Sequence, residues 1–394
     1  MFPLNNSNLL NFLIWLIKTP SLSGQEEKVA KIIFREMNNL EYDEVFTDEL
    51  GSVIGIINSK RGKTICFNGH MDHVPEGDLN NWKYHPYSGT VDGDYLYGRG
   101  TVDMKSALTS MIYAAAKARD NELLNGRVIV AAVVFEELQE GIAMKNIVEN
   151  HNINPDAVIL GEPTNLNLAI GHRGRAEIQI TIHGKTSHAS MPELGDNAVF
   201  KALPLLQVLK NINEEMPEHP VLGKETLALT KIISEPPEGP IIPDKCKIFL
   251  DRRISVLSTK EEILLETKKI LDSISDKLSK NDVEYKIIET DLKCYTGYTL
   301  KAERFFYKWV LDEESPIVKK AIEALKEIGL SPKIMIWRFG TDGSYTAGEK
   351  GIPTIGFGPG DEKLAHQPNE HISIKDVYKA VNGYISLAKN LLKT

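Results

Sequence analysis

The stretch RVIVAAVVFEELQEG, residues 127–141, decides the fold of this chain. From Val128 to Phe135 it contains only small, β-branched or other apolar residues, which is typical of a strand that a parallel sheet buries on both faces. Two adjacent glutamates, Glu136 and Glu137, follow at once. Because neighbouring carboxylates repel each other and resist leaving water, this strand ends either in solvent or beside a cation.

Similar apolar runs recur along the chain and alternate with helix-like segments. The further strand-like runs are SVIGIIN from Ser52, KTICFNG from Lys63 and DAVILGE from Asp156. Helix-like patterns cover Met104 to Asp120 and Ile142 to Glu149. This alternation predicts an α/β fold, with a mixed central sheet and flanking helices.

Polar side chains that can bind a metal follow several of these predicted strands. His70 and Asp72 come after KTICFNG, Glu162 comes after DAVILG, and His366 follows IPTIGFGPG near the C-terminus. In open α/β sheets, ligands gather outside the carboxyl ends of the strands. Together with the two glutamates after Phe135, these residues predict a site at one edge of the sheet.

The middle of the chain has a different order of elements. From about Arg173 the pattern reads strand, helix (Asn197 to Asn213), strand, strand, helix (Thr259 to Lys277), strand, which is the ferredoxin-like α+β arrangement. We therefore predict an inserted domain at residues 173–289, within a first domain made of residues 1–172 and 290–394.

Composition limits the classes of protein that need consideration. The chain has 394 residues, of which 42% are hydrophobic and 25% charged, as in ordinary globular proteins. Its formal net charge of −8 and the lack of a Lys/Arg cluster argue against a nucleic-acid partner. The three cysteines are dispersed and odd in number, so we expect no disulfide framework and a cytoplasmic location.

The N-terminal segment NLLNFLIWLI, Asn8 to Ile17, is apolar enough to resemble part of a signal peptide. It lacks a basic region before it, and Lys18-Thr-Pro follows where a small-residue cleavage site is needed. It is also too short to cross a bilayer. We expect a helix that packs on the body of the protein, and no membrane partner.

Three candidate residues have ordinary explanations when each is taken alone. His70 and Asp72 are two residues apart in an extended segment and point the same way, so Asp72 can hold one ring nitrogen of a metal-bound His70. Taken singly, His-x-Asp also fits a surface loop, and Asp103 in YGRGTVDMK fits a helix cap. Their shared placement at one predicted sheet edge favours a site.

The order of several motifs resembles a known family. The stretches TPSLSGQE from Thr19, GHMDHVP, YGRGTVDMK, the Glu-Glu pair, GEPT, KTSHASMPELGDNA, DRR, AHQPNE and the HISI after Glu370 occur in this order. This pattern is similar to the co-catalytic zinc family, which contains acetylornithine deacetylase, succinyl-diaminopimelate desuccinylase, aminoacylases and related carboxy- and dipeptidases. The resemblance covers nearly the whole chain.

The resemblance implies a zinc-peptidase-like catalytic domain that holds two zinc ions, for which cobalt or manganese can substitute. The implied ligands are Asp103 as the bridge, His70 and Glu162 on one ion, and Glu137 and His366 on the other. It also implies that Glu136 takes a proton from the bridging water and hands it to the departing amine. Glu136 and Glu137 then coexist because a metal neutralises Glu137.

Further roles are implied for residues elsewhere in the chain. His188, in TSHAS, would reach a partner subunit's active site across a homodimer interface formed by the inserted dimerisation and lid domain. Arg253, in FLDRRI, would bind a substrate carboxylate. Gly340 and Thr341, in RFGTDGSY, would contact the substrate through the backbone.

Two positions depart from the family pattern. Leu138, Gln139 and Glu140 precede Gly141, where the family often has glycine sooner after the Glu-Glu pair. Pro240, in GPIIPD, stands at or beside the position of a common asparagine. The first departure can alter the floor of the site, and the second argues against close identity with the desuccinylases.

The function that these features favour is a metal-dependent amidohydrolase that cleaves an N-acyl or N-carbamoyl amino acid. The small-molecule substrate is expected to carry a carboxylate that meets Arg253. A dipeptidase or carboxypeptidase with the same core is the alternative within enzymes. A non-catalytic dimeric binding protein is the alternative outside them, although such a protein is expected to lose the base or a ligand.

Overall fold

The computed structural model describes residues 6–58 and 62–393, which fall into two compact units. The first unit contains the described residues of 1–172, 291–300 and 309–394. The second contains Arg173–Thr290 and Lys301–Lys308. The domain limits at residues 173 and 289 stay a prediction. The sequence did not indicate that Lys301–Lys308 also belong to the second unit.

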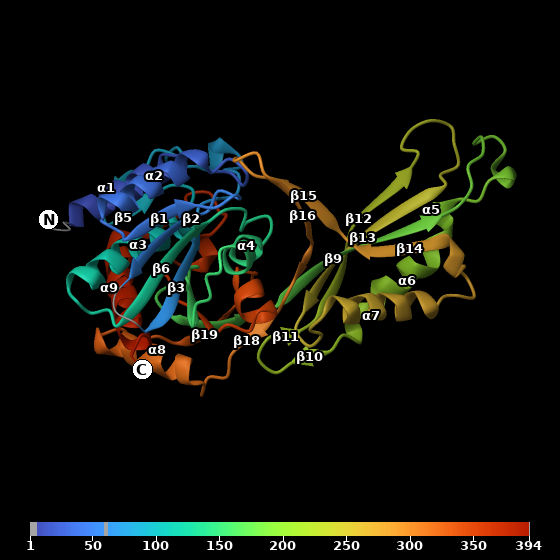
Figure 1. Ribbon diagram of the computed structural model, residues 1–394. Coiled ribbons are helices and arrows are strands. Elements are labelled where there is room, and N and C mark those ends of the chain that lie inside the picture. The colour runs from blue at the N-terminus through green and yellow to red at the C-terminus, as the bar shows by residue number, and fades with distance from the viewer. Residues whose placement is uncertain (1–5, 59–61, 394) are drawn as a thin grey trace. The chain divides into compact units, whose positions relative to one another are not determined.

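A mixed nine-stranded sheet forms the centre of the first unit, in agreement with the predicted fold class (Figure 1). Its strands in spatial order are β1 (Glu44–Thr47), β2 (Val53–Asn58), β6 (Gly126–Val133), β3 (Lys63–His70), β7 (Ala157–Leu160), β20 (Thr354–Gly356), β8 (Leu168–His172) and β18 (Trp309–Val310), with β19 (Ile334–Trp337) also on β8. The four strands β6, β3, β7 and β20 run parallel to one another. These are the four strands whose carboxyl ends were predicted to form the site.

The buried residues of β6 explain why the sheet forms around it. Every residue from Val128 to Val134 is fully buried, because β2 and β3 pair with β6 on its two edges and helices cover its faces. Helix α3 (Ser106–Asp120) packs beside α9 (Ile374–Leu391) on this sheet, and α8 (Pro316–Glu327) packs on α9. The rings of Phe67 in β3 and Tyr384 in α9 lie 5.2 Å apart.

The remaining helices and a small sheet complete the first unit. They are α1 (Asn6–Ile17), α2 (Glu27–Asn39), α4 (Ile142–Asn150) and the three-stranded sheet of β4 (Thr90–Asp92), β5 (Tyr95–Tyr97) and β21 (His371–Ser373). Helix α1 packs on α3 as expected, with Leu13, Leu16 and Ile17 fully buried. Among the described residues, none of the helices combines the length and the apolar character that a membrane span requires.

The second unit has the predicted ferredoxin-like order. Strands β9 (Gly174–His183), β12 (Thr226–Glu235), β13 (Lys245–Ile254) and β14 (Val283–Ile287) pair antiparallel in the order β12-β13-β9-β14. The short strands β17 (Phe305–Phe306), β10 (Glu218–His219) and β11 (Gly223–Lys224) make smaller pairings. Strands β15 (Glu289–Lys293) and β16 (Thr299–Glu303), which pair with each other, contain residues of both units. Helices α6 (Leu203–Asn211) and α7 (Lys260–Asp272) cover one face of the four-stranded sheet.

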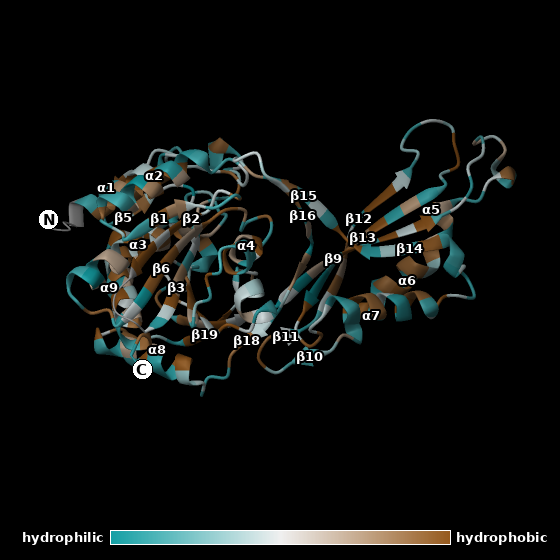
Figure 2. Cartoon of the chain, viewed as in Figure 1, coloured by the Kyte–Doolittle hydropathy of each residue, from teal (hydrophilic) through white to brown (hydrophobic). Residues whose placement is uncertain are grey.

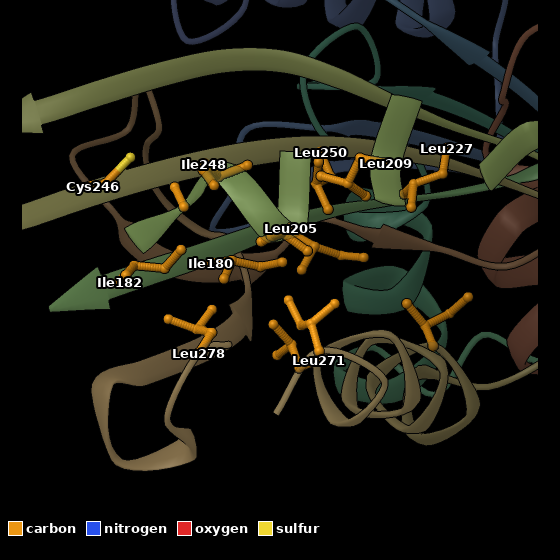
Figure 3. Close-up of a cluster of buried hydrophobic side chains, with 14 of the residues drawn as sticks. Ile180, Ile182, Leu205, Leu209, Leu227, Cys246, Ile248, Leu250, Leu271 and Leu278 are labelled. Atoms are coloured by element: carbon orange, nitrogen blue, oxygen red, sulfur yellow. The ribbon is translucent and has the colours of Figure 1, made fainter. Parts of the chain in front are cut away.

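The core of the second unit lies between these helices and the sheet. Figure 3 shows Ile180 and Ile248 of the sheet facing Leu205 and Leu271 of the helices. Helix α7 carries hydrophobic and hydrophilic residues in turn along its length, as Figure 2 shows. This pattern gives the helix one buried face.

The predicted helix over Asn197 to Asn213 is divided in the structure. A short helix, α5 (Ala198–Lys201), precedes α6, and Pro204 lies in the first turn of α6. Because proline has no N–H group, it cannot continue the hydrogen bonding of α5. Helix α7 begins after Thr259, whose side chain and that of Glu262 form a capping box, and it ends at Asp272 rather than at Lys277.

Replacing a buried residue of α7 tests this core. Ile263 is fully buried, so Ile263→Ala is expected to lower the free energy of unfolding by about 2–5 kcal/mol. Leu265 on the same helix is 51% exposed, and Leu265→Ala is expected to change it by less than about 0.5 kcal/mol. Urea unfolding followed by circular dichroism measures both. Equal effects of the two substitutions would contradict the assignment of the buried face.

Candidate metal centre

The parallel strands of the first unit bring the predicted ligands together. His70 is the last residue of β3, Glu162 follows β7, and Glu136 and Glu137 follow β6. Asp103 lies in the buried segment Thr101–Lys105 that leads into α3, where its own backbone is extended rather than helical, with φ −123° and ψ 94°. His366 lies in the loop between a short helical turn at Glu362–Leu364 and β21.

The carboxylate of Asp103 lies between the two predicted histidine ligands. Its Oδ1 is 2.8 Å from Nε2 of His70, and its Oδ2 is 3.1 Å from Nε2 of His366. Each oxygen therefore faces a different imidazole. A carboxylate in this position has the arrangement of a group that bridges two cations.

A further carboxylate stands beside each histidine. Oε1 of Glu162 is 3.6 Å from Nε2 of His70, and Oε2 of Glu137 is 3.1 Å from Nε2 of His366. Two groups have their possible ligand atoms within 4.8 Å of one another, namely His70, Asp103 and Glu137, and His70, Glu136 and Glu162. The predicted division of ligands between two ions stays a prediction, but its five residues all lie in one cluster.

The buried carboxylates of the cluster can all be charged together only if positive charge lies near them. Burial raises the pKa of Glu162 and of Glu137, and the negative charge of Asp103 raises each further. Burial and the charge of Glu162 likewise raise the pKa of Glu136 far above its usual range. Oxygen and imidazole atoms without thiolate are the donors that suit divalent zinc, cobalt or manganese, so these residues fit such ions.

The two histidines of the cluster interact electrostatically with these carboxylates. Burial disfavours the charged form of His70, but Glu162 and Asp103 outweigh it and raise its pKa. Hydrogen bonds to Asp103 and Glu137 raise the pKa of His366 to about 10. In turn, the hydrogen bonds from His366 and His70 outweigh the burial of Asp103 and lower its pKa. The cluster therefore ionises as one unit whose charges depend on one another.

Asp72 connects the two sides of the cluster. Its backbone carbonyl accepts a hydrogen bond of 2.9 Å from Nδ1 of His70, which fixes the ring so that Nε2 points at Asp103. Its carboxylate accepts the backbone N–H groups of Glu136 and Glu137, both at 3.2 Å, and the hydroxyl of Ser23 at 2.6 Å. Asp72 thus positions both a ligand and the predicted base.

Glu26 is a buried residue that the sequence interpretation missed. Its Oε1 accepts the N–H groups of Gly24 at 2.9 Å and of Phe135 at 3.3 Å. Phe135 has a positive φ of 63°, so this bond holds a constrained backbone just before Glu136. Burial and the charge of Asp72 raise the pKa of Glu26 to about 8. The signal in the sequence was TPSLSGQE, which contributed only to the family resemblance.

The loop that contains Gly340 and Thr341 is attached to the same edge of the sheet through Asp342. The buried carboxylate of Asp342 accepts N–H groups from Asn68, two residues before His70, at 2.8 Å and from Gly141 at 2.6 Å. Sequence reasoning missed Asp342, although it lies inside the quoted RFGTDGSY. The carboxyl group of Glu140 lies against Gly340, where any Cβ atom would overlap it. The departure at residues 138–140 therefore does reach the predicted substrate loop.

His188 and Arg253 belong to the second unit. His188 is exposed in the loop after β9, where its Nδ1 is 2.7 Å from the hydroxyl of Ser190. Pro240 lies beside this loop, because its carbonyl accepts the N–H of Ala189 at 2.7 Å. Arg253 donates to Asp251 at 2.8 Å, with its side chain 35% exposed. Arg252 points to the other face and is fully buried, as the alternation along the strand predicted.

The raised pKa of Glu26 predicts a pH dependence of stability. In the unfolded chain this carboxyl ionises near its usual pKa of 4.5, but in the folded protein it keeps its proton up to about pH 8. The folded state therefore binds more protons between these values, so ionisation of the unfolded state lowers stability as the pH rises from 4.5 to 8. Glu26→Gln removes this contribution.

Thermal unfolding of the chelated wild type and of Glu26→Gln at pH 5 and pH 8 measures the effect. The midpoint of the wild type is expected to fall relative to that of the variant between these values. Parallel changes in the two proteins would show that Glu26 does not hold a proton in the folded state.

Comparison with known proteins identifies the family. The model of peptidase family M20/M25/M40 matches residues 66–390. The uncharacterized protein YgeY of Escherichia coli (strain K12) is 33% identical over 366 residues, which cover 92% of this chain and 89% of YgeY. Succinyl-diaminopimelate desuccinylase 2 of Ruegeria sp. (strain TM1040) is 30% identical over 337 residues, which cover 83% and 80% of the two chains.

Solved structures share the fold over the full length. Aminopeptidase PepT from Bacillus cereus has a TM-score of 0.73 at 20% identity and 99% coverage of both chains. Bacillus subtilis YXEP, described as a dinuclear metal binding peptidase from the M20 family, has a TM-score of 0.72 at 17% identity and the same coverage. Since the family match extends over most of its length, this chain belongs to peptidase family M20/M25/M40 and is a metallohydrolase of that family.

Proposed function

We propose that this protein is a dinuclear zinc-dependent amidohydrolase that releases a free amine from an N-acyl amino acid. The observation that carries the proposal is the position of Asp103, whose two oxygens face His70 and His366 separately. A second histidine on the far oxygen of this carboxylate, with Glu137 beside it, supports a second ion. The donor atoms favour zinc, and cobalt or manganese can replace it.

His70, Asp103 and Glu162 would hold one ion, and Asp103, Glu137 and His366 the other. Divalent ions supply Lewis-acid polarisation of a carbonyl group and make water a nucleophile near neutral pH. Asp72 keeps the ring of His70 in the tautomer that presents a bare Nε2 to the centre.

Glu136 is the residue that would move the proton. Its Oε1 is buried and has no hydrogen-bond partner in the described part of the chain, while its backbone N–H is held by Asp72. Burial favours the neutral form of this carboxyl and nearby cations favour the charged form. We expect the balance to give a pKa at which Glu136 accepts a proton from water and donates it to the leaving amine.

Three residues are proposed to recognise the substrate. Arg253 would bind the carboxylate of the substrate, since a guanidinium can form two parallel hydrogen bonds with it. Gly340 and Thr341 would contact the substrate through backbone groups. The named desuccinylase among the relatives supports an acyl amino acid, and the named aminopeptidase among the structures supports a short peptide. An N-carbamoyl amino acid and a dipeptide therefore remain the alternative substrates.

A homodimer is proposed through the edge of the second unit. Strand β12 is an edge of the four-stranded sheet, and Leu229 and Ile232 on it are each 44% exposed. Phe200 in α5 is 69% exposed and Leu203 in α6 is 49% exposed. An unpaired edge strand with apolar neighbours is a surface that another chain can cover. The partner subunit's His188 would then stabilise the developing oxyanion.

The non-catalytic alternative has little support, because the base and all five proposed ligands are present in one cluster. A cytoplasmic location also stays a proposal. It rests on the three dispersed cysteines, which are free and buried.

Amine release by the metal-loaded protein tests the function. The panel holds N-acetyl, N-succinyl and N-carbamoyl amino acids and dipeptides. We expect turnover of one class, and Glu136→Gln is expected to lower kcat by about 10²- to 10⁴-fold with both metals retained. Glu314→Gln, on a 78% exposed side chain, is the control. A protein that binds two metals and releases no amine from any compound would contradict the proposed substrate class.

The mass of the protein in solution tests the dimer. Light scattering on a sizing column is expected to give a dimer for the wild type and a monomer for Leu229→Glu. Leu265→Glu places the same charge on a 51% exposed leucine of α7, which packs at the opposite edge of the sheet. A monomeric wild type, or loss of the dimer in both variants, would show that β12 is not the interface.

A further inference from the structure

A buried ion pair lies beside the candidate centre without containing any of its proposed ligands. Nη1 of Arg99 is 2.7 Å from Oε2 of Glu370, and the two side chains are 3% and 0% exposed. A buried pair of this kind adds little net stability over apolar residues, because both charges lose their water. The hydrogen bonds that Arg99 and Glu370 make to neighbouring loops therefore matter more for the structure than the stability that the ion pair itself adds.

Glu370 fixes the loop that contains Asp103. Its second oxygen, Oε1, accepts the backbone N–H groups of Val102 at 2.7 Å and of Asp103 at 3.2 Å. Its backbone carbonyl accepts the N–H of Gly98 at 2.9 Å. Glu370 thus fixes the backbone of Asp103, whose carboxylate is proposed to bridge the two ions.

Arg99 fixes the loop that contains His366. Its guanidinium donates to three backbone carbonyls at 3.4 Å, those of His366 and Gln367 in this loop and that of Pro75 in the segment after His70 and Asp72. The ring of Trp82 covers the guanidinium, with its centre 5.2 Å from Cζ. Only a planar guanidinium, whose N–H groups point in several directions, can donate hydrogen bonds to all these carbonyls at once.

The two halves of the centre differ in how they are supported. His70 and Glu162 follow buried strands of the central sheet. His366 lies in a loop, has a positive φ of 63°, and its side chain is 49% exposed. A non-glycine residue with this backbone needs support from its surroundings, and the guanidinium of Arg99 supplies it at the carbonyl of His366 itself.

We propose that Arg99, held by Glu370, is a positioning residue that determines the affinity of the metal position formed by His366 and Glu137. The position formed by His70 and Glu162 does not depend on it to the same degree. This inference rests on the proposed dinuclear centre, and it adds that occupancy of the second position is set by a clamp of residues that bind no metal.

Arg99→Lys is the test, because lysine keeps the charge opposite Glu370 and loses the fork. Metal-free protein is titrated with Zn²⁺ in a calorimeter, without substrate, and metal content after dialysis is measured by atomic emission. We expect the first equivalent to bind as in the wild type and the second to bind at least tenfold more weakly. Glu370→Gln is a second variant, expected to weaken the second equivalent at least as much.

Arg252→Lys is the matched control. Arg252 is also a fully buried arginine that binds carboxylates, those of Glu225 and Glu266, but it lies in the second unit. It is expected to lower the unfolding midpoint and to leave both metal equivalents unchanged. In a His366→Ala background, Arg99→Lys is expected to cause no further loss of metal affinity, since both act on one position.

Unchanged binding of both equivalents in Arg99→Lys would overturn the proposal, as would equal weakening of the two. Weakening of the second equivalent in Arg252→Lys would show a general effect of stability and would also overturn it. A wild type that binds fewer than two equivalents would overturn the dinuclear centre itself. Because the titration uses no substrate, a wrong substrate class leaves its outcome unaffected.

Discussion

The repulsion between buried carboxylates at one edge of a sheet is the constraint on which this structure depends. Asp103, Glu136 and Glu162 are each at most 8% exposed, and burial disfavours the charged form of each, although hydrogen bonds from His366 and His70 outweigh it and lower the pKa of Asp103. They can be charged together only if positive charge lies among them. Protonated His70 and His366 lie beside these carboxylates and provide part of it. The two divalent ions that we propose would provide more, one on each side of Asp103, whose oxygens face His70 and His366 separately.

The fold satisfies this constraint by placing the predicted ligand residues at one edge of the central sheet. Parallel strands β6, β3 and β7 end at the same edge and deliver Glu136, Glu137, His70 and Glu162. Buried acceptors then hold the backbone of the loops that follow, with Asp72 under the Glu-Glu pair, Glu370 under Asp103 and Asp342 between two loops. These acceptors are themselves carboxylates, so they add to the negative charge of the region. That charge further favours the presence of cations at this edge of the sheet.

Much of this arrangement follows from the sequence, because it depends on local patterns. The apolar run before Glu136, the run that ends at Gly69 and the order of elements in the second unit each predict their elements from nearby residues. The placement of the ligands follows from the rule that parallel strands end together. The residues that were missed depend on long-range contacts. Glu26 acts through Phe135, and Arg99 acts through His366, across separations of more than 100 residues.

The limits of sequence reasoning also appear in details of packing. Glu140 was recognised as a departure, but only folding shows that its carboxyl group lies against Gly340. The break between α5 and α6 depends on Pro204, a local signal that the apolar pattern over Asn197 to Asn213 obscured. Sequence spacing predicts which helix or strand a residue belongs to, whereas the contacts between loops depend on the fold of the whole chain.

The proposed dinuclear centre requires both metal positions to share the single carboxylate of Asp103. The most direct test is the number of zinc ions retained after dialysis by the wild type, Asp103→Ala and His366→Ala. We expect two ions for the wild type, one for His366→Ala and loss of both from Asp103→Ala at the same zinc concentration. Retention of one tightly bound ion by Asp103→Ala, with affinity equal to that in the wild type, would contradict it.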